Sequence, residues 1–340
     1  MISVPMKILF LLSKRQPPSS RLRITSMVPA LERDGWSCTV LPIPSDPVGR
    51  LRMIGACRRH DVVVLQKKTS LHPAELWLMR HANPSLVFDF DDAVMFHELE
   101  HGKPLRVKSF AKFLRTVKAC RAVVAGNEFL AGFARPLCPE VHVLPTPIDT
   151  DLYRPKDHRT HGDGVTVGWL GTPGGLGHLE HLAGVFQDVS SKLEGFRVKI
   201  VSSAFIDLPG VEVIKKRWRL EEEIADLQSF DIGIMPLRES LWTRGKCGYK
   251  ILQYMGVGLP VIASPVGING ELVRNGETGF LAGDEAAWRE ALETLAADPA
   301  LRARMGAAGR DRVGRRYSQH EYTKAYACIL ADLSGMKRCR

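Results

Sequence analysis

The chain of 340 residues is too long for one ordinary hydrophobic core, and its length suits two domains of roughly 150 residues each. Its composition, 45% hydrophobic and 25% charged, is that of a soluble globular protein. A net charge of +10 attracts nucleotides, nucleic acids and anionic lipids alike, so charge alone selects no partner.

The cysteines and the first apolar run argue against a disulfide-rich or zinc-binding protein and against an N-terminal signal peptide or membrane span. Seven cysteines, an odd number, are scattered without a Cys-x-x-Cys pair, which argues for a reducing cytosol and against a disulfide framework or a structural zinc site. The apolar run at 8–12 is too short for a signal peptide or a membrane span. It is interpreted as part of a buried strand.

The first half of the chain alternates predicted strands with predicted helices. Strands are expected at 6–12, 38–42, 61–65, 86–90, 122–125 and 141–144. A helix is expected over 21–34, and Asn127 is well placed to cap another that opens at Glu128. This alternation predicts an α/β fold with a doubly wound parallel sheet.

Three carboxylates follow the strand at 86–90, in the order Asp89, Phe90, Asp91, Asp92. Grouped oxygen ligands suit Mg²⁺, and an Asp-x-Asp after a strand also occurs in phosphohydrolases that form an aspartyl phosphate. Asp91 or Asp92 could instead cap the next helix. A metal site, a phosphohydrolase nucleophile and a helix cap all stay open at this point.

A basic amphipathic helix is predicted over 104–121, because its apolar residues recur at helical spacing and its lysines and arginines occupy other faces. Such a helix can lie on an anionic bilayer. More often it covers a sheet with its solvated face outward.

A linker signature separates the two halves. Prolines at 145, 147 and 155 are followed by a polar run at 156–164. We therefore expect one Rossmann-like domain over 1–155 and a second over 156–320, followed by a terminal helix within 321–340.

The second half opens with a strand at 165–170 and a loop with four glycines in seven residues, at 171–177. Such a loop between a strand and a helix can cradle phosphate through its backbone amides. Further strands are expected at 196–201, 231–237 and 261–263, and outer helices at 286–295, 299–317 and 321–333. Four cations at 215–219 are interpreted as a loop that leads into a helix with an acidic first turn.

The most specific pattern lies at 246–281, which reads KCGYKILQYMGVGLPVIASPVGINGELVRNGETGFL. It predicts a helix over 249–255, a glycine stop, the strand at 261–263 and a series of glycine turns with a short helical start at 271–273. This order brings backbone amides to the carboxyl ends of parallel strands, where phosphates bind.

This stretch resembles the nucleotide-sugar half of the family 4 glycosyltransferases, which are retaining enzymes of the two-domain GT-B architecture. The family pattern has Glu-Ala-Met, Gly-x-Pro-Val-Ile, Glu-Ile/Leu-Val and Asn/Asp-Gly-x-x-Gly-Phe in this order. The chain departs from it at the two paired glutamates, where it carries Gln253 and Gly245. Gln253 can still bond a ribose hydroxyl through its amide, whereas Gly245 offers only backbone.

The resemblance implies two doubly wound Rossmann-like domains that face a central cleft. The domain over 1–155 would be the acceptor side, the domain over 156–320 would bind the nucleotide sugar, and the helix within 321–340 would pack back on the first domain. It implies transfer of a sugar, with retention, from a nucleoside diphosphate donor to an acceptor hydroxyl, in bacterial surface-glycan, polysaccharide or glycoconjugate synthesis. Catalytic roles fall to Asp91, facing the reacting sugar, and to Lys250. Donor contacts are expected from Gly171, Thr172, Lys246, Gln253 and Glu271, with Lys246 and Lys250 on the diphosphate.

The partners implied are the nucleotide sugar and a glycan or lipid-linked acceptor, with no nucleic acid. We expect neither a metal nor another cofactor, and a cytoplasmic protein that can contact the inner face of an anionic membrane.

Two rival functions remain. A nucleotide-sugar-binding protein without transfer activity would explain the missing glutamates. A magnesium-dependent phosphohydrolase would use the cluster from Asp89 to Asp92.

Overall fold

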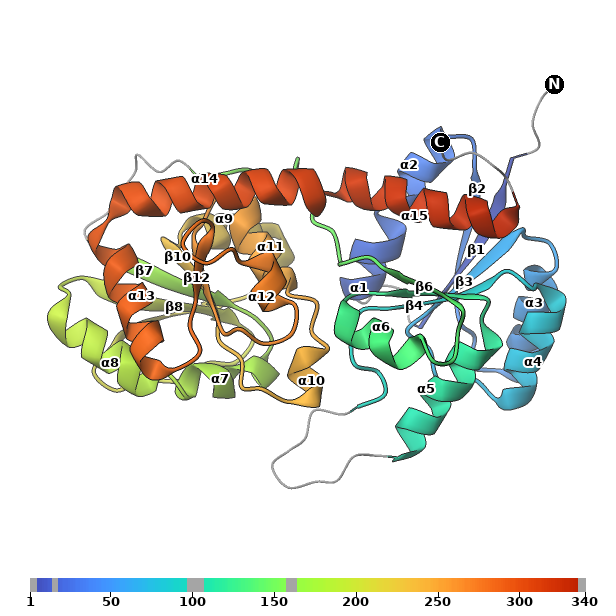
Figure 1. Cartoon of the computed structure of the whole chain (residues 1–340), viewed down its shortest axis with the longest axis horizontal. Coiled ribbons are helices and arrows are strands. Elements are labelled where there is room, and N and C mark those ends of the chain that lie inside the picture. Colours follow the sequence, from blue (N-terminus) through green and yellow to red (C-terminus); the bar gives the residue numbers. More distant parts are fainter. Residues whose placement is uncertain (1–4, 14–17, 97–106, 157–163, 336–340) are drawn as a thin grey trace. The chain divides into compact units, whose positions relative to one another are not determined.

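A computed structural model describes residues 5–13, 18–96, 107–156 and 164–335 (Figure 1). The chain forms two compact units. The first unit contains Met1–Pro147, Arg244–Cys247 and Gln319–Arg340, and the second contains Ile148–Thr243 and Gly248–Ser318. The division falls between Pro147 and Ile148, whereas the linker signature places the predicted domain boundary after residue 155.

The first unit is built on a six-stranded parallel sheet with the order β2-β1-β3-β4-β5-β6. Its strands are β1 (Lys7–Leu12), β2 (Ser37–Pro42), β3 (Val62–Gln66), β4 (Leu86–Phe90), β5 (Ala122–Ala125) and β6 (Glu140–Val143). The central strands β3, β4 and β5 are buried along their whole length, because helices cover both faces of the sheet.

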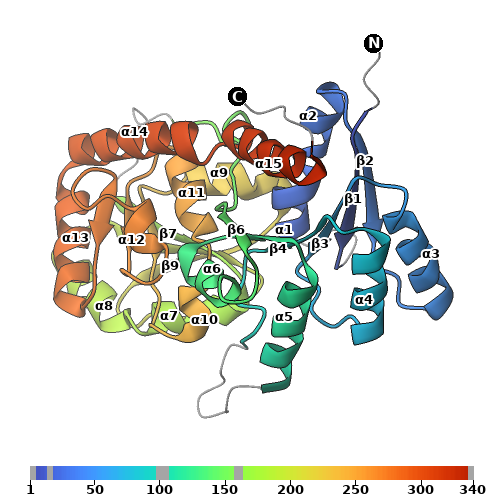
Figure 2. The same cartoon turned by 45° about the vertical axis from the view of Figure 1, so that its right-hand side comes forward.

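Helices of the first unit cover the sheet in two layers. They are α1 (Pro18–Ser20), the π-helix η1 (Arg21–Thr25), α2 (Val28–Arg33), α3 (Pro47–Cys57), α4 (Pro73–Ala82), α5 (Val107–Ala119), α6 (Glu128–Ala134) and α15 (Gln319–Ser334). Figure 2 shows α3 and α4 side by side, and α5 packs next to α4. Tyr322, Tyr326 and Leu330 of α15 form a core on the sheet face that Ile8 and Phe10 also line.

The second unit repeats the plan with the strand order β12-β11-β10-β7-β8-β9, again all parallel. Its strands are β7 (Val165–Leu170), β8 (Phe196–Ser202), β9 (Glu212–Arg217), β10 (Ile232–Met235), β11 (Val261–Ala263) and β12 (Gly279–Leu281).

Helices of the second unit also form two layers, with α8 and α13 packed together on one face (Figure 1) and α11 and α14 packed together on the other. The elements are η2 (Pro173–Gly175), α7 (Leu176–Glu180), α8 (Ala183–Lys192), η3 (Leu220–Glu222), α9 (Glu223–Gln228), α10 (Leu241–Arg244), α11 (Tyr249–Gly256), α12 (Asn269–Leu272), α13 (Glu285–Ala297) and α14 (Pro299–Arg316).

The predicted fold class, two doubly wound Rossmann-like units with parallel sheets, is confirmed. The predicted helix over 21–34 is instead divided into η1 and α2, and Pro29 stands in the first turn of α2, where its missing N–H is tolerated. The cations at 215–219 do not form a loop throughout, because 212–217 is the edge strand β9. Cys328 is disulfide-bonded, which the scattered cysteines did not predict.

Candidate active site

The carboxyl ends of the second unit's strands gather at one edge of its sheet, here called the second carboxyl edge. Strand β7 ends at Leu170 and leads directly into the glycine loop, whose residues Pro173–Gly175 form η2. Helix α11 starts at Tyr249, after the connection that follows β10. The sequence therefore brings the glycine loop and the first turn of α11 to the same edge.

Lys250 lies beside the glycine loop. Its Nζ is 4.3 Å from the centre of the Trp169 ring, a cation–π contact with a buried indole. A Cβ added to Gly171 would lie 2.5 Å from this Nζ and 2.7 Å from the indole, and one added to Gly175 would lie 2.7 Å from the indole. Only glycine leaves room for the ammonium so close to the loop backbone.

Thr172 belongs to the same group of residues. It precedes η2, its side chain is exposed, and its carbonyl oxygen accepts a hydrogen bond of 2.9 Å from the amide of Gly175. The structure thus brings three of the predicted donor residues together: Gly171, Thr172 and Lys250.

Gln253 lies one turn beyond Lys250 on α11 and is buried. Its Nε2 donates to Oε1 of Glu223 at 3.0 Å and to the Tyr153 hydroxyl at 3.2 Å. The Tyr153 hydroxyl in turn donates to Oε1 of Glu223 at 2.5 Å. Burial and the Glu223 carboxylate raise the pKa of Tyr153, so this hydroxyl stays protonated and keeps donating.

Glu271 stands on α12, directly after the connection that follows β11. Its side chain is exposed, and its Oε1 accepts a 3.4 Å hydrogen bond from the hydroxyl of Tyr317. Its carbonyl oxygen accepts from the guanidinium of Arg312 at 2.7 Å. The backbone is therefore anchored while the carboxylate remains accessible to a ligand.

The first unit's carboxyl edge carries the three aspartates, and Asp89 is closed off there. Arg23 donates to both of its carboxylate oxygens, at 3.0 and 2.8 Å, and neither side chain is exposed. Tyr326 of α15 adds a hydroxyl at 3.3 Å. Burial raises the pKa of Asp89, and Arg23 opposes that rise. This bidentate pair occupies the carboxylate that a phosphohydrolase would use as nucleophile.

Asp91 and Asp92 share a different cation, Lys67, which follows β3. The Lys67 ammonium lies 3.0 Å from Oδ1 of Asp91 and also bonds the carboxylate of Asp92. Burial by itself lowers the pKa of Lys67, but the two carboxylates outweigh it and raise the pKa above its usual range. Neither aspartate directly precedes a helix among the described residues, because 91–96 forms bends and turns and the next described helix, α5, begins at Val107. The predicted cap of the next helix involves 97–106, which lie outside the described residues.

Lys67 also has an uncommon backbone, with a φ of 53° in the left-handed region that non-glycine residues rarely occupy. Its amide donates to the carbonyl oxygen of Asp89 at 2.8 Å, which holds this conformation in place. Strained residues of this kind gather at functional sites.

The tetrapeptide Arg244–Cys247 belongs to the first unit and lies close to the aspartates. The thiol of Cys247 donates a hydrogen bond to the carbonyl oxygen of Asp91, with 3.0 Å between sulfur and oxygen. The side-chain amide of Asn127 donates to the carbonyl oxygen of Lys246 at 3.0 Å. Burial and Asp91 raise the pKa of Asp92, whereas Lys67 and Lys246 lower it. The charge of Lys246 therefore favours the ionised carboxylate of Asp92. The predicted contact of Lys246 with a diphosphate stays a prediction.

Gly245, where the family 4 pattern predicts a glutamate, is closely packed in the first unit. A Cβ at this position would lie 2.6 Å from the Cβ of Ala93 and 3.2 Å from Leu130. A glutamate side chain has no room there, because the packing of the first unit leaves space only for glycine.

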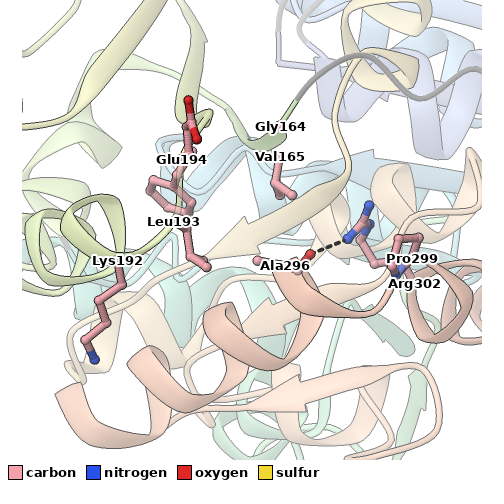
Figure 3. A pocket seen from close by; sticks show the side chains of 9 residues that line it. Gly164, Val165, Lys192, Leu193, Glu194, Ala296, Pro299 and Arg302 are labelled. Carbon is pink, nitrogen blue, oxygen red and sulfur yellow. Dashed lines mark hydrogen bonds between the residues drawn. The ribbon is translucent and has the colours of Figure 1, made fainter.

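The cavity in Figure 3 lies at the opposite edge of the second unit's sheet. It has a volume of about 390 Å³ and opens beside Val165 and Phe196, at the amino ends of β7 and β8. Arg302, on its wall, donates to the carbonyl oxygens of Leu295 and Ala296, at the end of α13. The cavity contains none of the predicted site residues.

Two features are absent from the residues that the structure describes. No group of three or more His, Cys, Asp or Glu side chains in that part of the chain is arranged to hold a metal ion. None of the helices described combines the length and the hydropathy that a transmembrane span requires.

Sequence reasoning missed Glu223, Tyr153 and Lys67. Glu223 stands in a run of three glutamates that reads as an acidic first turn, yet it lies four residues before the buried Leu227, on the same helical face. That spacing was the available signal. Lys67 gave none, because its partners lie more than twenty positions away.

Comparison with known proteins places this geometry in context. Residues 181–298 match the family model described as Glycosyl transferases group 1. The match runs from the end of α7 to the end of α13, so it contains Lys250, Gln253 and Glu271. A search of curated proteins found no match.

Three similar structures cover nearly the whole chain. Sucrose-phosphate synthase from Thermosynechococcus elongatus is 13% identical with a TM-score of 0.69, covering 97% of this chain and 99% of its own. Anabaena HepE in complex with UDP and glucose is 16% identical with a TM-score of 0.67, covering 96% and 100%. A Rickettsia africae glycosyltransferase is 15% identical with a TM-score of 0.69, covering 97% and 98%. The chain therefore has the GT-B fold of these proteins, and its second half carries a segment of the group 1 glycosyltransferase model.

Proposed function

We propose that this protein is a glycosyltransferase that moves a sugar from a nucleoside diphosphate donor to an acceptor hydroxyl. One observation carries the proposal: the Lys250 ammonium lies beside Gly171 and Gly175 at the second carboxyl edge, within the segment that matches the family model. A solved protein of similar fold, HepE, holds UDP and glucose, which supports a nucleotide sugar as the donor here.

The chemistry needs a stabiliser for the charge that develops on the leaving diphosphate. A charged hydrogen bond from Lys250 contributes about 1.5 to 3 kcal/mol. The Trp169 ring beneath Lys250 orients the ammonium in advance, and the glycine loop lets phosphate oxygens approach the backbone. Glu271 supplies an exposed acceptor for the hydroxyls of the donor sugar.

Asp91 is proposed to contact the reacting sugar on the acceptor side. The Lys67 ammonium pairs with its carboxylate and orients it, which suits a group that must accept hydrogen bonds or stabilise positive charge. The proposal includes retention of the anomeric configuration, membership of family 4 and a role in surface-glycan synthesis, all of which rest on the resemblance in the sequence. The anomeric proton coupling of the product, measured by NMR, tests retention.

The reaction is proposed to need no metal ion, because lysine and loop amides can meet the charge of the diphosphate. The three aspartates that would serve a magnesium site are paired with Arg23 and Lys67. This pairing also disfavours the phosphohydrolase.

A thermal-shift screen with UDP, GDP, ADP, TDP and CMP, each with EDTA and with magnesium, tests the proposal. We expect one diphosphate to raise the melting temperature in EDTA, since a ligand that binds only the folded state stabilises it. The corresponding nucleotide sugar should then yield a glycosylated product. Binding without a product from any acceptor would favour the non-catalytic binding protein, and stabilisation only with magnesium would favour the phosphohydrolase.

Contact with an anionic membrane is proposed through α5, whose exposed side includes Lys112, Arg115 and Lys118. Flotation with anionic and with neutral vesicles tests this contact. Replacing the three cations by glutamate should abolish binding to anionic vesicles only. Equal flotation of wild type and the triple variant with anionic vesicles would contradict the membrane contact. It would not bear on the proposed transfer reaction.

A further inference from the structure

A buried carboxylate in the second unit has no role in the function proposed so far. Glu223, the first residue of α9, is only 6% exposed and accepts three hydrogen bonds. Two come from Tyr153 and Gln253, as described above, and the third comes from Nε1 of Trp218 at 2.8 Å. Burying a carboxylate is unfavourable unless its oxygens are bonded, so this group of donors is arranged around it.

The carboxylate determines how the amide of Gln253 is turned. A carboxylate can only accept, so the NH₂ group of Gln253 must face Glu223. The same NH₂ group also donates to the oxygen of the Tyr153 hydroxyl. That hydroxyl donates its own proton to the carboxylate of Glu223. Both acceptors lie on the Nε2 side of the amide, so Oε1 of Gln253 is turned away from the carboxylate.

That oxygen is the informative atom. Among the described residues, no hydrogen-bond partner is found for Oε1 of Gln253, although the side chain is only 3% exposed. A nearly buried acceptor without a partner in the protein is placed to receive a donor from a ligand.

The position of Gln253 indicates which part of a ligand would supply that donor. Gln253 follows Lys250 by three positions on α11, so the two side chains are neighbours on one helical face, about 5–6 Å apart at Cβ. In a nucleotide, the ribose directly follows the phosphates. A diphosphate at Lys250 therefore places ribose hydroxyls near Gln253.

We propose that Glu223 is a positioning residue that turns Gln253 into a hydrogen-bond acceptor for a ribose hydroxyl. The inference rests on the proposed function, because it needs a nucleotide at Lys250. The neutral amide of Gln253 then accepts the hydrogen bond that a carboxylate would otherwise accept. The negative charge lies on Glu223, the hydrogen-bonded neighbour of Gln253. Glu223 also holds the indole of Trp218 in place through the hydrogen bond from its Nε1, although Trp218 is 40% exposed.

The test compares four proteins: wild type, Glu223→Gln, Gln253→Met, and the exchange variant with Glu223→Gln and Gln253→Glu together. Calorimetry gives the Kd of the diphosphate that binds wild type best and of its 2′-deoxy and 3′-deoxy analogues. The readout is the ratio of the deoxy Kd to the ribose Kd. Inorganic pyrophosphate, which lacks ribose, serves as the control ligand in all four proteins.

We expect wild type to bind one deoxy analogue about fivefold more weakly, the effect of one lost neutral hydrogen bond. The ratio should fall towards one in Glu223→Gln, because a glutamine there no longer dictates the amide orientation, and in Gln253→Met, which has no acceptor. The exchange variant should recover the ratio, since the carboxylate introduced on α11 would accept from both the ribose and the amide introduced on α9. Pyrophosphate binding should stay within twofold throughout.

Three results would overturn the inference: no discrimination by wild type, an unchanged ratio in Gln253→Met, or an unchanged ratio in Glu223→Gln. If Glu223→Gln does not fold, Gln253→Met and the exchange variant still decide the question. Failure of wild type to bind any nucleoside diphosphate would instead refute the proposed function, and this inference with it.

Discussion

The two carboxyl edges have the same backbone plan but place their charged side chains in different surroundings. In the first unit, Asp89 is locked against Arg23, and Asp91 and Asp92 are held by Lys67. In the second unit, the lysine at the edge lies on the face of an indole, next to glycines that keep the surroundings open. The first edge pairs its carboxylates with cations of the protein, whereas the second carries the lysine for which we propose a contact with the donor diphosphate. The same parallel sheet can thus serve two chemical roles.

The largest effect is expected at the pair of the first edge. Arg23→Ala leaves Asp89 buried without its cation, and the free energy of unfolding should fall by about 3–5 kcal/mol. Urea denaturation measures this. Arg135→Ala, which removes an exposed ion pair with Glu128 in the same unit, should cost under about 1 kcal/mol. Equal losses would mean that burial does not distinguish the two pairs.

The second effect is expected at the lysine of the second edge. Lys250→Ala should weaken binding of the nucleoside diphosphate by about 10- to 100-fold, because one charged hydrogen bond is lost. Calorimetry measures the Kd. The matched control is Lys192→Ala, at the end of α8 beside the cavity of Figure 3, which should change the Kd less than twofold. A similar Kd for both variants would remove Lys250 from the diphosphate site.

The third prediction concerns the open space around that lysine. Gly171→Ala places a methyl group 2.5 Å from the Lys250 ammonium, and the displaced lysine should bind the diphosphate about fivefold more weakly. Gly177→Ala, in the same loop region but with nothing within 4 Å, should bind like wild type. The same calorimetric assay compares them, and identical Kd values would contradict a need for close approach at Gly171.

The smallest effect is expected at the strained residue of the first edge. Lys67→Gly and Lys67→Ala both remove the ammonium that holds Asp91, but only alanine keeps the left-handed strain at a φ of 53°. The glycine variant should therefore be more stable by about 1 kcal/mol in urea denaturation. An alanine variant of equal or greater stability would show that the backbone at this position is unstrained.

Patterns of local hydrophobicity predicted most of the fold. The strands β4, β5, β7 and β11 begin and end at the predicted residues, because they are short, buried and bounded by turns. The edge strand β9 was missed since its outer residues are lysine and glutamate, which resemble a polar loop. Three-residue β12 lies among glycine turns and shows no period of its own.

The site was predictable only where its residues lie close together in the sequence. Gly171 and Thr172 share one loop, and Lys250 and Gln253 share one helix, so their motifs were visible. The partners that set their behaviour come from elsewhere: Glu223 lies thirty positions from Gln253, and Arg23 lies sixty-six from Asp89. Pairings over such distances depend on how the sheet is assembled, which local patterns do not encode.

The division of the chain has a consequence for protein engineering. The tetrapeptide Arg244–Cys247 belongs to the first unit although both of its neighbours in sequence belong to the second, and α15 returns to the first unit at Gln319. A fragment cut after Pro147 would lack the cysteine that bonds Asp91 and the tyrosine that bonds Asp89. Chimeras that exchange the first unit must therefore transplant three separate segments, and a single crossover point would yield two incomplete halves.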